Sequence, residues 1–299
     1  MDHDRLFKEL LTTFFHEFLE LFFEDIADLI DRTQPPRFLD KEIFGELTSD
    51  RRRELDLVAL VKLANGDAHF LVHMEPQSQR IDDFPEKMFR YFAKLWDRHG
   101  LRVYPIAILS FESPREIQES QLCMRFPGLN VLDFRFSIVQ LNRLDWKAFV
   151  TKPNPVASAL MARMKFPEED RPRVKLQCLR LLATLRLEPA KSALISRFVD
   201  NYLPLKPPEV RIFDEILETL PEMEQQDIMQ ITTSWKEEGR LEGRLEGLRN
   251  GLTTALHALF GDRAKGLTER LQTFDLATLQ KLDRQIVSGA QLENLEATV

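Results

Sequence analysis

The stretch from Arg51 to Arg80, RRRELDLVALVKLANGDAHFLVHMEPQSQR, limits the possible folds more than any other part of the chain. Two apolar runs flank Asn65-Gly66, and an Asn-Gly pair in this setting is the strongest short signal for a β-hairpin. We therefore predict two paired strands, 54–63 and 68–77. Because side chains alternate between the faces of a strand, one face of the hairpin is wholly apolar and must meet a hydrophobic core. That face carries Leu55, Leu57, Ala59, Val61, Leu63, Phe70, Val72 and Met74.

The other face of the predicted hairpin is apolar in its middle and acidic at one end. If Asn65-Gly66 is a two-residue loop, Asp56 lies directly opposite Glu75. If Gly66-Asp67 is the loop, Asp56 lies opposite Gln77. In both registers the three polar side chains share one face, because an even shift keeps every side chain on its own side of the sheet.

Two carboxylates that face each other on a sheet repel, and burial raises the cost of an unpaired charge. A hard divalent cation, Mg²⁺ or Mn²⁺, would relieve this repulsion because it takes oxygen ligands from one or two carboxylates. Gln77 could then hydrogen-bond a metal-bound water. The spacing alone is equally compatible with a solvent-facing hairpin end, whose acids pair with Arg51, Arg52 and Arg53.

The remaining N-terminal segments complete an α/β pattern. Apolar residues at three- and four-residue spacing predict a helix over residues 4–31, which the prolines of QPPRF end. We further predict a strand at 37–48, a helix at 83–98, and strands at 101–111 and 129–142. With the hairpin, the predicted order is α-β-β-β-α-β-β.

After Asp145 the pattern changes to helices separated by prolines. The helical candidates are 155–165, 168–187, 190–202, 208–219 and 222–237. The segment KPNP has the composition of a linker and places a boundary near residue 150. We thus expect an α/β domain at 1–150, a helical domain at 151–237, and an all-α module at 238–299 that begins with the repeat EEGRLEGRLEGLRNG.

The leucines of this repeat predict a packing surface. Leu241, Leu245 and Leu248 fall on one helical stripe, so residues 241–252 should pack against another helix, in the same chain or in a second copy. The glycines cost about 1 kcal/mol each in a helix, so this helix needs such a partner or frays. A homo-oligomer formed through the C-terminal helices is therefore one expectation.

Charge and composition restrict the partners and the location. The net charge of −7 argues against tight passive binding to nucleic acid, which usually requires a basic surface. It leaves open an enzyme that grips phosphates through metal ions, because metal-binding acids count as negative charge. Cys123 and Cys178 form no CxxC motif, which fits a reducing cytosol.

No apolar run approaches the ~20 residues that span a bilayer, and the start, MDHDRLFKELL, lacks the basic region of a signal peptide. We expect a cytoplasmic protein without a membrane partner.

Several segments, in order, resemble one group of enzymes. The segments DHDRLFKELL, FLDKE, HMEPQSQ, FPEKMFRYFAKLWDRHG and VYPIAIL are similar to the Rpn-like recombination-promoting nuclease and transposase-related group of the PD-(D/E)xK superfamily, over about residues 2–140. The last segment, from LHALF to LENLEA, resembles a small helical C-terminal domain that often ends these proteins. The resemblance implies an αβββαβ restriction-endonuclease-like core and cleavage of DNA phosphodiesters with Mg²⁺ or Mn²⁺.

By position, the resemblance makes Asp56 and Glu75 metal ligands and places Gln77 where the superfamily usually has its catalytic lysine. This is a departure from the superfamily, although the Rpn-like group also has Glu-x-Gln. A lysine would bring positive charge to the attacking water or the transition state, which a glutamine cannot. The superfamily often adds an acid from the first helix; Glu9, Glu17 and Glu20 are all candidates. His3 and Asp4 belong to the group's N-terminal signature.

Four further arginines are candidate contacts for DNA phosphates: the run Arg51, Arg52 and Arg53, and Arg90 on the predicted helix 83–98, one turn before Lys94. Each of these arginines is equally consistent with an ordinary surface charge that is exposed to solvent. His73 shares the face of Glu75 and could assist a metal site or only partner a neighbour. Two functions follow: a Mg²⁺- or Mn²⁺-dependent DNA endonuclease, or a nuclease-fold scaffold of weak catalysis that self-associates through its C-terminal helices.

Overall fold

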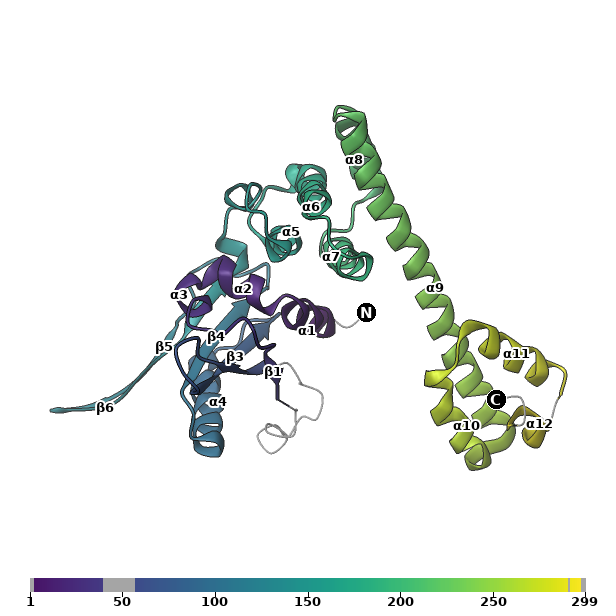
Figure 1. Ribbon diagram of the computed structural model, residues 1–299, viewed down its shortest axis with the longest axis horizontal. Coiled ribbons are helices and arrows are strands. Elements are labelled where there is room, and N and C mark those ends of the chain that lie inside the picture. Colours follow the sequence, from purple (N-terminus) through teal and green to yellow (C-terminus); the bar gives the residue numbers. More distant parts are fainter. Residues whose placement is uncertain (1–2, 40–56, 290, 297–299) are drawn as a thin grey trace. The chain divides into compact units, whose positions relative to one another are not determined.

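The computed structural model describes residues 3–39, 57–289 and 291–296 (Figure 1). The chain forms two compact units, Met1–Ile231 and Thr232–Val299. This differs from the expected division into three, because one hydrophobic core continues across residue 150. Phe18, Leu160 and Phe198 are all fully buried in it.

The first unit is built on a mixed five-stranded sheet. Its strands, in the order β1-β2-β3-β4-β7, are β1 (Arg37–Phe38), β2 (Leu57–Lys62), β3 (His69–Gln77), β4 (Val103–Leu109) and β7 (Ser137–Gln140). The first three are antiparallel neighbours, whereas β4 runs parallel to both β3 and β7. This confirms an α/β first part followed by helices. The predicted strand 37–48 starts at β1, and its residues from 40 onward lie outside the described ranges.

The β2–β3 register agrees with a loop centred on Asn65-Gly66. Leu57 pairs with Met74, and the ladder continues to Lys62 and His69. The alternative register, centred on Gly66-Asp67, is therefore wrong. Gly66 has a φ of +133°, which a glycine adopts without strain. Asp56 and Arg51–Arg53 lie outside the described residues.

Three short helices cover one face of the sheet, where a single helix over 4–31 was predicted. They are α1 (His3–Thr13), α2 (Phe15–Phe22) and α3 (Glu24–Ala27). The backbone leaves helical angles at Phe14 and Phe23. Adjacent residues of a straight helix point about 100° apart, and the break at Phe14 lets both Phe14 and Phe15 enter the core.

The opposite face is covered by α4 (Phe84–His99), close to the predicted 83–98 (Figure 1). Pro85 occupies the first turn, where its missing N–H costs no hydrogen bond. Gly100 ends the helix in the left-handed conformation, with φ of +61°. The buried stripe of α4 consists of Phe84, Met88, Tyr91 and Leu95.

The helices that follow the sheet each have a proline in the first turn, and the prediction of helices separated by prolines is confirmed. They are α5 (Pro155–Leu160), α6 (Arg171–Leu185), α7 (Pro189–Tyr202) and α8 (Pro207–Glu218), with the short 3₁₀ helix η4 (Met161–Arg163) after α5. Asn154 caps α5 by accepting hydrogen bonds from the N–H groups of Val156 and Ala157. Helix α1 contacts a helix that is distant in the sequence: the ring of Phe7 packs edge-on against that of Phe198 in α7, with 5.0 Å between ring centroids.

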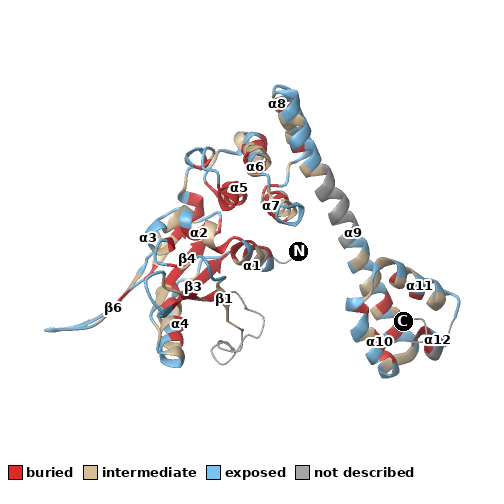
Figure 2. Cartoon of the chain, in the orientation of Figure 1, coloured by how far each residue is buried: buried red, intermediate tan, exposed pale blue. Residues whose placement is uncertain are grey.

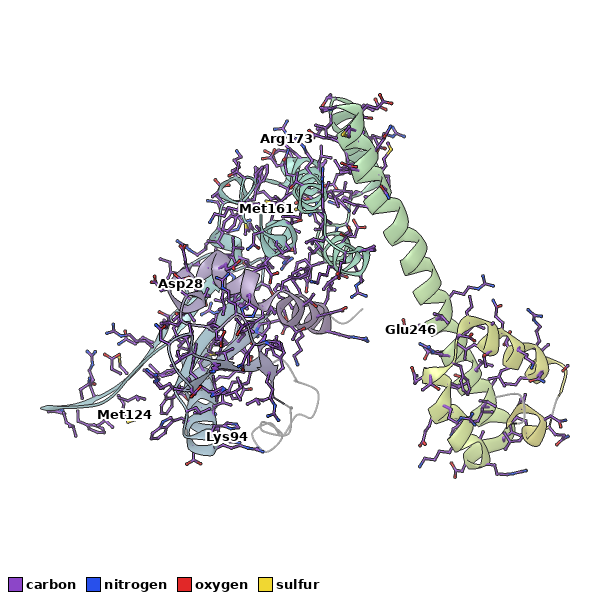
Figure 3. All side chains as sticks on the ribbon, viewed as in Figure 1. Asp28, Lys94, Met124, Met161, Arg173 and Glu246 are labelled. Carbon is purple, nitrogen blue, oxygen red and sulfur yellow. The ribbon has the colours of Figure 1, made fainter. Side chains whose placement is uncertain are left out.

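A second hairpin projects from the sheet, where only one strand at 129–142 was predicted. It consists of β5 (Gln121–Phe126) and β6 (Leu129–Arg135), joined by Pro127-Gly128. The strand prediction was wrong at Phe136, which is buried on the α4 side and separates β6 from β7. The hairpin is largely exposed (Figure 2), and Met124 near its end is labelled in Figure 3.

The second unit is helical. It contains the C-terminal part of α9 (Glu222–Phe260) with α10 (Lys265–Arg270), α11 (Leu276–Val287) and α12 (Leu292–Glu296). Leu245, Leu248 and Leu252 pack into its core, which confirms intrachain packing for these members of the leucine stripe. Among the described residues, no helix has the length and apolar character needed to cross a membrane.

Candidate active site

Three polar residues at the carboxyl end of β3 are buried under α4. Side chains alternate along the strand, so Val72 and Met74 enter the core beneath α1 and α2, while His73, Glu75 and Gln77 point to the side of α4. His73 and Glu75 are fully buried, and Gln77 is 6% exposed. A buried carboxylate requires compensation by a charge or by hydrogen bonds.

Lys87 supplies that compensation from the first turn of α4. Its ammonium donates hydrogen bonds to Oε1 of Glu75 and, at 3.4 Å, to Oε1 of Gln77. The same ammonium lies 5.5 Å from the ring centroid of Tyr91, one helical turn further on. With 23% of the Lys87 side chain exposed, the ion pair is at the border between protein and solvent.

Gln77 is fixed by its backbone as well as by its side chain. Its Nε2 donates to the carbonyl of Gln79 at 2.7 Å, which turns Oε1 toward Lys87. Its own carbonyl accepts hydrogen bonds from the N–H of Ser110 at 2.9 Å and from the Ser110 hydroxyl at 3.3 Å. The amide is therefore held in one orientation at the carboxyl edge of the sheet.

His73 is neutral at physiological pH. Burial lowers its pKa to about 3, and the nearby charge of Lys87 acts in the same direction. Its ring packs edge-on against Tyr91, with 5.6 Å between centroids. A neutral imidazole can accept a hydrogen bond or bind a metal ion, but it cannot act as a general acid here.

Tyr91 keeps its proton over the whole physiological range. Burial raises its pKa to about 12, and the negative charge of Glu75 contributes to the same shift. The phenol is thus a stable donor beside the Glu75–Lys87 pair.

The described part of the site holds one carboxylate suited to a divalent cation. Glu75 offers hard oxygen ligands of the kind that Mg²⁺ and Mn²⁺ prefer. Within residues 3–39, 57–289 and 291–296, no group of three or more His, Cys, Asp or Glu gathers as metal ligands. The expected second ligand, Asp56, is outside these ranges. Glu75 could therefore be one ligand of the ion, and the other ligands would have to come from elsewhere. When the ion binds, the Glu75 carboxylate would either contact both the ion and the Lys87 ammonium or lose its ion pair with Lys87.

A cavity of about 370 Å³ opens beside Gln77. Its wall combines the loop after β3 with the segment that follows β4, and its charged lining residues are Arg80, Asp82, Glu116 and Glu119. This surface gives solvent and ligands access to the edge of the sheet. Its excess of acids favours cations over isolated anions.

Two other sets of predicted site residues lie within the described ranges: Arg90 and the first-helix acids. Arg90 is exposed on α4 and pairs with Glu86 at 3.2 Å. The first-helix acids belong to α1 and α2, which cover the opposite face of the sheet; Glu9 is paired with Arg197, and Glu20 with Arg32. None of them reaches the α4 side, where Glu75 points.

Lys87 and Tyr91 were not among the residues predicted from the sequence. A signal was present, because Lys87 lies one turn before Tyr91 at the border of an otherwise apolar helical stripe. No family model, no curated protein and no solved structure matches the chain. The function proposed below is therefore inferred from the geometry of this site.

Proposed function

We propose that the protein is a divalent-metal-dependent endonuclease that hydrolyses DNA phosphodiesters. One observation carries the proposal. Lys87 places its ammonium on Glu75 and Gln77. It thereby brings from α4 the positive charge that the superfamily pattern places at the position of Gln77. Lys87, ten residues after Gln77 in the sequence, thus supplies the charge that the superfamily's lysine would supply at position 77.

The arrangement of the elements supports the same proposal. After the three N-terminal helices, the described elements follow the order β1, β2, β3, α4, β4, which agrees with the αβββαβ order that the resemblance implies. The acid and amide lie at the carboxyl end of β3, where its partner β4 also ends. Such an edge is where α/β sheets commonly bind ligands.

Each residue has a definite task in this reaction class. Glu75, together with Asp56, would hold the ion, which supplies a nucleophilic water at neutral pH and neutralises charge on the phosphate. Lys87 can stabilise the additional negative charge of the transition state from its fixed position. Gln77 can orient a water through its amide, and Tyr91 can donate its phenolic proton as a hydrogen bond.

A second candidate function is a scaffold of weak catalysis that self-associates through its C-terminal helices. Two observations favour it. Lys87 already neutralises Glu75 and would compete with a metal ion for the carboxylate. The cavity beside Gln77 is lined by more acids than bases, which disfavours a polyanion.

The decisive experiment is cleavage of supercoiled plasmid by the purified full-length protein with Mg²⁺, with Mn²⁺ or with EDTA. We expect divalent-dependent nicking, lowered about 1,000-fold or more in Glu75→Gln, which corresponds to about 4 kcal/mol of activation energy. Asp56→Asn should be equally impaired. Glu86→Gln, an exposed acid on α4, is the matched control and should retain activity. Absence of cleavage, or equal cleavage by wild type and Glu75→Gln, would favour the scaffold.

The role of Lys87 has its own comparison. Lys87→Met should lower the cleavage rate about 100-fold or more, because a preorganised charge at the transition state is lost. Lys94→Met, about two turns further along the same helix, serves as the control. If both variants lose activity equally, α4 contributes only general charge and the specific role of Lys87 is refuted.

A further inference from the structure

We propose that Arg163 is a positioning residue for the candidate active site, acting from the helices that follow the sheet. This inference rests on the proposed nuclease function for its catalytic consequence, but its structural basis is independent of that function. Arg163 is the last residue of η4, 86 positions beyond Gln77 in the chain. Its side chain nevertheless hydrogen-bonds Ser110, the residue after β4 whose N–H donates to the carbonyl of Gln77.

The guanidinium of Arg163 is fixed from three sides. Its Nε donates to the carbonyl of Ser110 at 3.0 Å, and Nη2 donates to the same oxygen. Its Nη1 donates to Oε1 of Glu112 at 3.0 Å. Its central carbon lies 5.2 Å from the ring centroid of Tyr202, and only 14% of the side chain is exposed. Such a side chain has lost most of its rotamer freedom.

Ser110 connects Arg163 with the site. It is the residue after β4, and it is 3% exposed. Its N–H and its hydroxyl both bond the carbonyl of Gln77, while its own carbonyl accepts from Arg163. A continuous chain of polar contacts therefore runs from Arg163 through Ser110 and Gln77 to Lys87.

The position of Ser110 explains why an arginine is useful there. The pairing of β4 with β7 ends at Leu109 and Gln140, so the carbonyl of Ser110 is beyond the ladder. A charged planar donor can bind such a carbonyl with two N–H groups, which neutral side chains cannot match. The segment that starts here then continues to Glu116 and Glu119, which line the cavity beside Gln77.

Two effects follow from this contact. Arg163 fixes the backbone of Gln77, and it fixes the start of the segment that forms one wall of the cavity. The helices after residue 150 thus belong to the active-site support. Without the guanidinium, the geometry of Gln77 and Lys87 should loosen while the apolar core, formed by other residues, persists.

The chain offers a close control in Arg171. Its side chain is 18% exposed, and it likewise bonds one carboxylate, Glu209 at 3.0 Å, and one carbonyl, Pro204 at 2.6 Å. These partners belong to the helical region and do not touch the strand ends. Arg163→Gln and Arg171→Gln therefore remove similar interactions at different places.

The test combines hydrogen exchange with kinetics on full-length protein. In Arg163→Gln we expect the amide of Ser110 to exchange at least tenfold faster than in wild type. The kcat for DNA cleavage should fall about tenfold or more, with little change in KM. Arg163→Lys should recover part of both losses, and Arg171→Gln should show neither. If the Gln variant does not fold, the same two readouts on Arg163→Lys decide.

Equal protection of Ser110 in wild type and Arg163→Gln would overturn the inference. So would equal losses in the Arg163 and Arg171 variants, because the effect would then be general destabilisation. If wild-type protein does not cut DNA at all, the nuclease proposal fails, and the exchange at Ser110 still decides whether Arg163 positions the strand end.

Discussion

The two faces of β3 are both buried but differ in polarity. On the side of α1 and α2, Val72 and Met74 are fully buried among apolar neighbours. On the side of α4, His73 and Glu75 are equally buried, yet both are polar and depend on specific partners. Neighbouring residues of β3 are thus equally buried, but those on one face are apolar and those on the other are polar.

The difference separates the residues that stabilise the fold from those to which we assign the proposed chemistry. Apolar burial lowers the free energy of the folded state in proportion to the area removed from water. A buried carboxylate and a buried imidazole do not, and residues that break the local pattern in this way concentrate at functional sites. The α4 side is therefore where substitutions should change activity as well as stability.

The largest stability effect should come from the apolar face. Met74→Ala removes a fully buried side chain and should lower the free energy of unfolding by about 2–5 kcal/mol, measured by urea denaturation. Ile117→Ala, at a 77% exposed position, is the control and should change it by less than about 0.5 kcal/mol. Similar small losses in both variants would mean that this face is not a packed core.

The ion pair gives the next largest effect. Lys87→Met leaves the buried Glu75 carboxylate without its ammonium and should cost about 3 kcal/mol of unfolding free energy. Adding Glu75→Gln should restore part of that loss, since the buried charge is then gone. In the exposed pair, Arg90→Met should cost less than about 0.5 kcal/mol. Additive losses in the Lys87/Glu75 double variant would contradict a coupled pair.

His73 predicts how the polar face responds to acid. Its folded pKa of about 3 lies below the ordinary value of 6.5, so the unfolded state binds more protons between these two values. The contribution of His73 to the free energy of unfolding is fully present above pH 6.5. It is lost as the pH falls toward 3, by at most about 1.4 kcal/mol per pH unit. His73→Leu should flatten the pH dependence of stability in this window relative to wild type. An unchanged slope would mean that His73 is not buried in neutral form.

The smallest effect concerns Tyr91. Glu75→Gln should lower its pKa only part of the way from about 12, because burial is the larger cause of the shift and remains in the variant. Ultraviolet titration of a variant in which Tyr104 and Tyr202 are replaced by Phe would isolate this phenol. A pKa that returns fully to 10 would make the charge of Glu75 the dominant cause.

Much of the polar face could be predicted from local patterns. The Asn65-Gly66 pair predicted the hairpin and left two registers open, and in both of them alternation placed Glu75 and Gln77 on one face. The residue that completes the pair could not be located in this way, because Lys87 reaches Glu75 only through the path of α4 across the sheet. Strand β5 was not predicted. Its apolar residues Met124 and Phe126 are exposed, so the composition of the strand does not match its exposure to solvent.

The contact between α1 and α7 has a consequence for the order of synthesis. Glu9 pairs with Arg197, and Phe7 packs against Phe198 and Tyr202, nearly two hundred residues later. Helix α1 thus leaves the ribosome long before α7, the helix that covers it. A chain that stops before α7 would present Phe7 to chaperones and proteases. Premature termination should therefore yield fragments that are cleared quickly.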